Sequence, residues 1–576
     1  MTTPQDDPAK WLATIFENSQ AMMRQFARPD AQSDDDDDKG NPTDPFLAAS
    51  KQFVEMQQSY IKQMTDAWSG LLQLPATSAP PLTAAPAQDD RRFSAEAWTK
   101  DPRFDAVKKM YLGYSDYLQS AVDAAPVDEK TRAQLHFAAR QFSEAISPAN
   151  FFATNPEAME LAAQTGGQSI IDGMKLFVED LAKGRISMTD ESAFEIGRNI
   201  AVTEGAVVFE NELMQLVQYA PRGKQVFARP LVIVPPAINK FYILDLQPEN
   251  SFVQYAIGEG HTVFLVSWRN IAPELGHLTW DDYLTLGVMS AIDVARNITR
   301  ADRVNTLGFC VGGTLLASAL AVMAANGEDH VASLTLLTSM LDYSDSGEIG
   351  LLISEQSVAA REQAIGNGGV LEGKELGFVF SSLRANDLIW QYVVNSYLKG
   401  KAPPAFDLLY WNSDGTNLPG PMFCWYVRNT YLENNLREPG KTVMCDTPVD
   451  LSKIAIPAYL YASREDHIVP WRTAYESNEL LSGETTFVLG ASGHIAGVIN
   501  PPKKNKRNYW MGGSRKGDAD AWLSSATSVP GSWWPDWSGW LARHGGKRIA
   551  ARAKLGNKRY SVIEPAPGRF VKARAD

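Results

Sequence analysis

The sequence predicts an α/β protein with a mostly parallel sheet, an aromatic-rich insertion in that sheet's connections, and an all-helical N-terminal part. From about residue 200, short apolar runs alternate with helix-forming runs, which is typical of a parallel sheet. Between residues 347 and 445 this alternation stops and aromatic residues gather. Before residue 195 the apolar residues recur at helical spacing. We therefore expect a helical domain at 1–195 and an α/β domain at 196–576, with a cap or lid at 347–445.

Composition narrows the possible functions. A chain of 576 residues can bury two or more cores, and no apolar run approaches the roughly 18 residues that would span a membrane. The first residues lack the basic and apolar regions of a secretion signal. A net charge of −13 argues against nucleic acid as a partner. Three cysteines without disulfide or CxxC metal spacing fit a reducing cytoplasm.

The N-terminal part contains two amphipathic stretches and two linkers. Residues 1–28 predict a short helix, and an acidic, breaker-rich linker follows at 29–45. The run from Asp34 to Lys39 in this linker also resembles an engineered protease site. Residues 46–72 place their apolar side chains on one helix face, which packs either on its own domain or on a partner or hydrophobic surface. A Pro/Ala-rich linker covers about 75–92, and helical segments continue to about 190.

The α/β part is predicted element by element from its apolar runs. Strands are expected at 230–235, 262–267, 303–308, 331–339, 456–461 and 485–489, with helices at 280–298 and 311–325. The cap falls between the fourth and fifth of these strands. A residue such as Trp411 in the cap could wall the site or fill the cap's own core. We expect that replacing it affects gating more than folding.

The turn at 307–314 has the features of a nucleophile elbow. It connects a strand to a helix through small residues, and it presents Cys310 at its tip. Gly308 and Gly312 leave room where a Cβ would clash. The start of the following helix favours a thiolate at Cys310. The alternative is a small buried cysteine that only packs a strand end.

Two further residues complete a candidate catalytic triad. Asp466 and His494 each follow a predicted strand, so they can converge with Cys310 at one edge of the sheet. The order nucleophile, acid, histidine is that of α/β-hydrolases, and the sheet is predicted to be of that type. His494 would take the thiol proton while Asp466 fixes the tautomer of the imidazole.

An oxyanion hole needs two N–H donors. Val311, directly after the nucleophile, is expected to supply one, and the loop containing Ile238 and Asn239 the other. Asn239 could instead simply cap a turn. The basic residues at 503–507, shortly after His494, are either a patch for an anionic substrate or a solvated loop.

Six stretches of the chain resemble polyhydroxyalkanoate synthases: 235–245, 267–270, 308–313, 386–395, 466–470 and 493–497. The resemblance runs from about residue 200 to the C-terminus, with weaker cover of the helical part. The chain's length resembles class I, the short-chain type, although medium-chain synthases share these motifs.

The resemblance implies polymerisation of (R)-3-hydroxyacyl-CoA, above all 3-hydroxybutyryl-CoA, into polyester with release of CoA. Cys310 would carry the growing chain as a thioester, and Asp466 would orient His494 or help activate the incoming 3-hydroxyl. It also implies a homodimer in the cytoplasm on polymer granules, with granule-coating phasin proteins as further partners. The resemblance implies neither a metal nor a cofactor. Two rival readings are a thioesterase or depolymerase with the same triad, and a non-enzymatic granule-coating protein.

Overall fold

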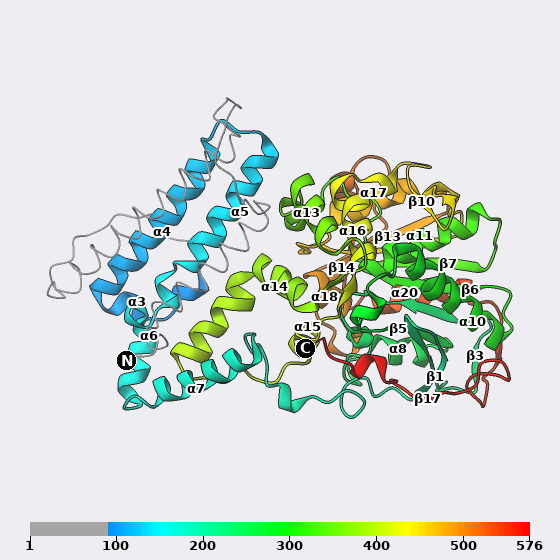
Figure 1. The fold of residues 1–576 in the computed structure, drawn as a ribbon, viewed down its shortest axis with the longest axis horizontal. Helices are drawn as coiled ribbons and strands as arrows, with labels where there is room; N and C mark the ends of the chain where they lie inside the picture. Colours follow the sequence, from blue (N-terminus) through cyan, green and yellow to red (C-terminus); the bar gives the residue numbers. More distant parts are fainter. Residues whose placement is uncertain (1–89, 576) are drawn as a thin grey trace. The chain divides into compact units, whose positions relative to one another are not determined.

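The computed structural model describes residues 90–575, and these fall into two compact units (Figure 1). One unit contains the residues up to Met188 together with Ser381–Pro404, and the other contains Thr189–Phe380 and the residues from Ala405 onward. The helices predicted at 1–28 and 46–72, the linker at 29–45 and most of the linker at 75–92 lie outside the described residues. The domain bounds 1–195, 196–576 and 347–445 stay predictions.

The first unit is helical throughout its described residues. Its long helices are α4 (Pro102–Asp123), α5 (Glu129–Ala145), α6 (Pro156–Gln164) and α7 (Gln168–Lys183). Side-chain caps begin α4 and α5, since Asp101 and Asp128 each accept a hydrogen bond from a backbone N–H of the first turn. The segment 381–404 packs with these helices through an ion pair of Lys399 with Glu157, at 2.7 Å, and a hydrogen bond from Tyr397 to Asp180, at 2.8 Å.

The second unit is built on an eleven-stranded sheet in the order β15-β14-β13-β12-β7-β6-β4-β5-β2-β1-β17. Its six central strands run parallel and coincide with the six predicted runs: β4 (Leu231–Val234), β5 (Val263–Trp268), β6 (Val304–Phe309), β7 (Val331–Leu337), β12 (Ala458–Ser463) and β13 (Thr485–Gly490). Antiparallel strands flank them: β1 (Gly205–Glu210), β2 (Met214–Tyr219), β14 (Asn508–Met511), β15 (Thr527–Pro530) and β17 (Glu564–Pro565). The predicted mostly parallel sheet is confirmed.

Both faces of the central sheet are buried. In β4 the side chains alternate: Val232 and Val234 join one core with α10 (Ser290–Thr299) and α11 (Val311–Ala325). Leu231 and Ile233 join a second core with α8 (Phe252–Gly258) and the tryptophan-rich α20 (Trp534–His544). The helix predicted at 280–298 forms in three continuous pieces, α9 (Trp280–Asp282), the π-helical η7 (Tyr283–Met289) and α10.

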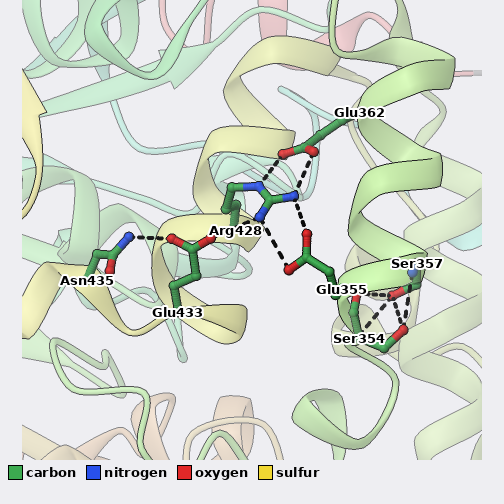
Figure 2. Close-up of polar contacts among 7 residues, drawn as sticks. All are labelled: Ser354, Glu355, Ser357, Glu362, Arg428, Glu433 and Asn435. Carbon is green, nitrogen blue, oxygen red and sulfur yellow. Dashed lines mark hydrogen bonds and ion pairs between the residues drawn. The ribbon is translucent and has the colours of Figure 1, made fainter.

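The segment between β7 and β12 is helical where a cap was expected. Its parts in this unit include α13 (Glu355–Ile365), α15 (Asp407–Asn412), α16 (Gly420–Val427) and η10 (Arg428–Leu432). Figure 2 shows how Arg428 joins two of them: its guanidinium contacts Glu355 and Glu362 of α13 at 3.0 and 2.6 Å, and Glu433 at 2.9 Å. Trp411 is buried and donates from its indole to the carbonyl of Lys240 at 2.7 Å.

Trp411 therefore belongs to the core of the second unit, which favours a role in folding for this residue over the predicted role in gating. Within residues 90–575, no helix combines the length and apolar character that crossing a membrane requires.

Candidate active site

The nucleophile elbow forms at the carboxyl end of β6. Cys310 has φ 52° and ψ −131°, a strained conformation for a residue with a side chain, and α11 begins at the next residue. A Cβ on Gly308 would lie 2.4 Å from Gly313 Cα, and one on Gly312 would lie 2.4 Å from the carbonyl oxygen of Val234. These are contacts with backbone atoms, which cannot move aside as a flexible side chain could. Glycine is therefore required on both sides of the strained cysteine, as the sequence predicted.

Asp466 and His494 meet at the carboxyl ends of β12 and β13, two adjacent parallel strands. Asp466 follows β12, and His494 begins the short helix α18 (His494–Val498) after β13. The imidazole Nδ1 lies 2.6 Å from Asp466 Oδ2, and the two side chains are 6% and 0% exposed. The second carboxylate oxygen accepts the N–H groups of Ile468 and Val469, both at 2.9 Å. Both oxygens of this buried carboxylate thus have hydrogen-bond partners that fix its orientation.

The charge state of His494 follows from its neighbours. Burial lowers the pKa of His494, but the charges of Asp466 and Cys310 and hydrogen bonds to both outweigh this, and they raise the pKa to about 10. Cys310, at the tip of the elbow, is thus one of the groups that act on the imidazole. The ring of Phe309 stacks on that of His494 at 5.8 Å and holds it beside the elbow. The structure brings Cys310, His494 and Asp466 into one constellation.

The predicted oxyanion donors lie on two elements beside the elbow. Val311 is the first residue of α11, so its N–H has no acceptor within the helix. The loop after β4 is held close to the elbow because Gly312 packs on the carbonyls of Val234 and Pro235. Asn239 pairs with Gly415 in an isolated β-bridge, in which Thr416 N–H donates to the carbonyl of Ile238 at 2.8 Å. Among the described residues, no hydrogen bond of the Asn239 side chain caps a turn.

A cluster of three tyrosines adjoins the elbow, and sequence reasoning did not assign it to the site. Tyr343 follows β7, whereas Tyr426 and Tyr431 lie on α16 and η10. The hydroxyl of Tyr343 lies 3.1 Å from Thr314 Oγ1, one helical turn beyond Cys310, and 3.2 Å from the hydroxyl of Tyr426. Tyr426 stacks in turn on Trp280, with ring centroids 5.4 Å apart.

These phenols stay protonated at neutral pH. Burial raises the pKa of Tyr343 to about 12, and Cys310 acts in the same direction; burial also raises the pKa of Tyr426 and Tyr431 well above the ordinary value, again with a contribution from Cys310. The cluster can therefore supply neutral hydroxyl groups and an aromatic wall beside Cys310. No periodicity in the sequence marks Tyr343, since its role depends on contacts between distant segments.

The basic residues at 503–507 follow α18 as an exposed loop that begins with a short 3₁₀ helix (Pro502–Lys504). Arg507 bends back so that its guanidinium donates to the carbonyl of Ala496, in the helix that His494 begins. The patch is therefore tied to the element that carries the histidine.

Comparison with known proteins gives two family matches. Residues 89–256 match the family described as "Poly-beta-hydroxybutyrate polymerase (PhaC) N-terminus", and residues 230–501 match the alpha/beta hydrolase fold. The second match confirms the predicted type of sheet.

Three curated relatives align with most of this chain. The chain is 52% identical to "Poly(3-hydroxyalkanoate) polymerase subunit PhaC" of Cupriavidus necator over 92% of this chain and 89% of that one. It is 41% identical to the protein of the same name from Rhizobium meliloti, over 92% and 87% of the two chains. It is 38% identical to "Poly(3-hydroxyalkanoate) polymerase 1" of Ectopseudomonas oleovorans, over 85% and 88%.

Proposed function

Since the chain belongs to the poly(3-hydroxyalkanoate) polymerase family, we propose that it polymerises (R)-3-hydroxyacyl-CoA into polyester and releases CoA, with 3-hydroxybutyryl-CoA as its main substrate. The growing chain is held as a thioester on Cys310. The observation that carries this proposal is the 2.6 Å hydrogen bond between His494 and the buried Asp466, beside a cysteine held at the tip of a strained elbow.

Acylation begins with the thiol of Cys310. His494 takes its proton, and the sulfur attacks the thioester carbonyl carbon of the substrate. A new C–S bond forms while the carbonyl electron pair moves to oxygen. When that pair returns, the bond to the CoA sulfur breaks and CoA leaves with the proton from His494. The raised pKa of the imidazole favours the charged state that this transfer creates.

The tetrahedral intermediate needs donors for its oxyanion. The N–H of Val311 supplies one donor and the loop at Ile238 and Asn239 the other. The close packing of Gly312 on Val234 and Pro235, which keeps the two elements adjacent, supports this assignment.

Chain growth requires the 3-hydroxyl of a second acyl group to attack the thioester on Cys310. In this step we assign proton removal to His494 and orientation of the imidazole to Asp466. Both oxygens of Asp466 are already engaged, one by His494 and the other by two backbone N–H groups, and its side chain is fully buried. A carboxylate so occupied is better suited to fixing the tautomer than to receiving a substrate hydroxyl.

The remaining assignments concern binding outside the triad. The basic residues at 503–507 suit the phosphate groups of CoA, and their link to α18 supports this role over a merely solvated loop. On α7, the exposed side chains of Ile171, Met174 and Leu181 suit attachment to a granule surface or to phasin proteins. We also propose a homodimer located on granules in the cytoplasm.

The decisive experiment supplies purified protein with (R)-3-hydroxybutyryl-CoA and follows both CoA release and product. Polyester supports the polymerase, whereas free 3-hydroxybutyrate in its place identifies a thioesterase. Granule binding without any CoA release identifies a structural protein. Repeating the assay across acyl lengths tests the proposed short-chain preference.

A further inference from the structure

The chain that leaves β7 packs against the back of the elbow. Thr338 has φ 40°, a left-handed conformation that β-branched residues rarely adopt, and its N–H donates to the carbonyl of Tyr461 at 2.7 Å. The next residue, Ser339, lies so near α11 that a Cβ on Gly313 would come within 2.1 Å of Ser339 Oγ. The strained turn therefore presses Ser339 onto the first turn of the helix that Cys310 caps.

The single hydroxyl proton of Ser339 is shared between two backbone carbonyls at the elbow, those of Cys310 and Leu337. The hydroxyl oxygen lies 2.9 Å from the carbonyl oxygen of Cys310 and 3.0 Å from that of Leu337. The Leu337 carbonyl also accepts the N–H of Cys310, at 3.0 Å. Ser339 is buried, so water does not compete for these contacts. The carbonyl of Cys310 has one further donor here, the N–H of Gly313 at 2.8 Å.

The hydrogen bonds to the Cys310 carbonyl also affect Val311, because one planar peptide group joins Cys310 to Val311. In a planar trans peptide the carbonyl oxygen of Cys310 and the N–H of Val311 point to opposite sides of the C–N bond. Fixing the direction of the carbonyl therefore fixes the direction of the N–H. A hydrogen bond to the carbonyl also polarises the N–H and strengthens it as a donor. Ser339 can thus act on an N–H that it does not touch.

We propose that Ser339 is a positioning residue for acyl transfer, which aims and polarises the Val311 N–H toward the oxyanion through the Cys310–Val311 peptide group. This inference rests on the proposed function. It assigns no bond making or breaking to Ser339 itself: the carbonyl electron pair moves onto the substrate oxygen as Cys310 attacks, and returns as the CoA sulfur departs.

Two reactions of the same sulfur separate this role from a structural one. Acylation by (R)-3-hydroxybutyryl-CoA passes through an oxyanion. Alkylation by iodoacetamide displaces iodide from a saturated carbon and forms no oxyanion, although it needs the same thiolate and elbow. Both are measured on the full-length protein, alkylation by mass spectrometry of the peptide that contains Cys310. The variant is Ser339→Ala, and the matched control is Ser333→Ala, which removes a buried hydroxyl from β7 that bonds to Asn305.

We expect Ser339→Ala to lower the rate of acylation about tenfold. This is less than the loss of an entire oxyanion donor, because Gly313 still holds the carbonyl. KM and the rate of Cys310 alkylation should stay unchanged, and Ser333→Ala should change neither reaction. Should Ser339→Ala be insoluble, Ser339→Gly removes the same hydroxyl.

If Ser339→Ala lowers the rates of acylation and alkylation equally, Ser339 has only a structural role at the elbow. If the acylation rate is unchanged, Ser339 has no role in acyl transfer. If wild-type Cys310 is alkylated but never acylated, the proposed function itself fails, whatever the variants do. A slower acylation with normal alkylation is the only result that supports the inference.

Discussion

Replacing Asp466 by asparagine changes the bond that orients the candidate base while preserving its shape. The asparagine oxygen can still accept the N–H groups of Ile468 and Val469. Its amide group then faces Nδ1 of His494 as a donor, so the imidazole must keep its proton on Nε2, the nitrogen that should receive the thiol proton of Cys310. The same change removes the charge that stabilises the imidazolium.

The size of the effect follows from the burial of the pair. Breaking a buried charge pair by removing one partner costs about 3–5 kcal/mol. If that cost falls on the transition state for acylation, the rate drops by two to four decades at about 1.4 kcal/mol per decade. We expect a loss on the order of a thousandfold, with KM little changed because we assign Asp466 to orienting His494 and not to binding substrate.

The assay is single-turnover release of CoA from (R)-3-hydroxybutyryl-CoA, followed by stopped flow. Asp245→Asn is the matched control: Asp245 is also buried but accepts the hydroxyls of Thr203 and Ser251 instead of a histidine, and its replacement should leave the rate unchanged. Acylation of Asp466→Asn at the wild-type rate would refute the assignment of Asp466 as the residue that orients His494.

Three further predictions concern the elbow, acid stability and the cap. Gly312→Ala should fold poorly, costing about 1–3 kcal/mol or more, because its Cβ meets backbone carbonyls, whereas Gly113→Ala has open space; thermal melts compare them. Burial lowers the pKa of His261 to about 4, whereas His261 in the unfolded chain has a pKa of about 6.5. Below about pH 6.5 the unfolded chain therefore binds a proton that the folded chain does not, and His261 lowers the free energy of unfolding by about 2 kcal/mol between pH 7.5 and pH 5. This loss should be smaller in His261→Phe, as measured by denaturant unfolding. If the cap opens before turnover, Arg428→Met should shorten a lag in CoA release, because it removes the ion pairs with Glu355 and Glu362 within the cap. Arg384→Met is the control, since it removes only the ion pair with Asp387, and it should leave the lag unchanged. Equal lags in both variants would argue against such gating.

The central sheet could be predicted from the sequence because its six parallel strands are buried on both faces. Such strands are continuous apolar runs between helices, as in β4 and β6. The antiparallel strands that flank the central sheet are not continuous apolar runs, so the same pattern does not predict them. In β2, Gln215 and Gln218 are buried and bond to Glu564 and Gly556 from the distant C-terminal region, so polar residues interrupt the run. β15 is largely exposed and ends in Pro530.

The arrangement of the three candidate catalytic residues could be anticipated for a similar reason. A glycine-flanked cysteine between strand and helix is a local signal, and the positions after two later strands put Asp466 and His494 at the same sheet edge. Ser339 and Tyr343 carry no such signal. They follow β7 in an irregular segment, and they acquire their contacts with Cys310 and Thr314 only when the strands assemble. The grouping of Ser381–Pro404 with the N-terminal helices likewise depends on contacts far apart in the chain.

The most direct test of the central claim is to find which atom carries the acyl group. Wild-type protein is mixed briefly with (R)-3-hydroxybutyryl-CoA, quenched in acid and analysed by peptide mass spectrometry. We predict a hydroxybutyryl adduct on the peptide containing Cys310, cleavable by hydroxylamine as a thioester, and none in Cys310→Ala, which should also release no CoA. An adduct on Cys424, on Cys445 or on a serine, or normal CoA release from Cys310→Ala, would contradict it.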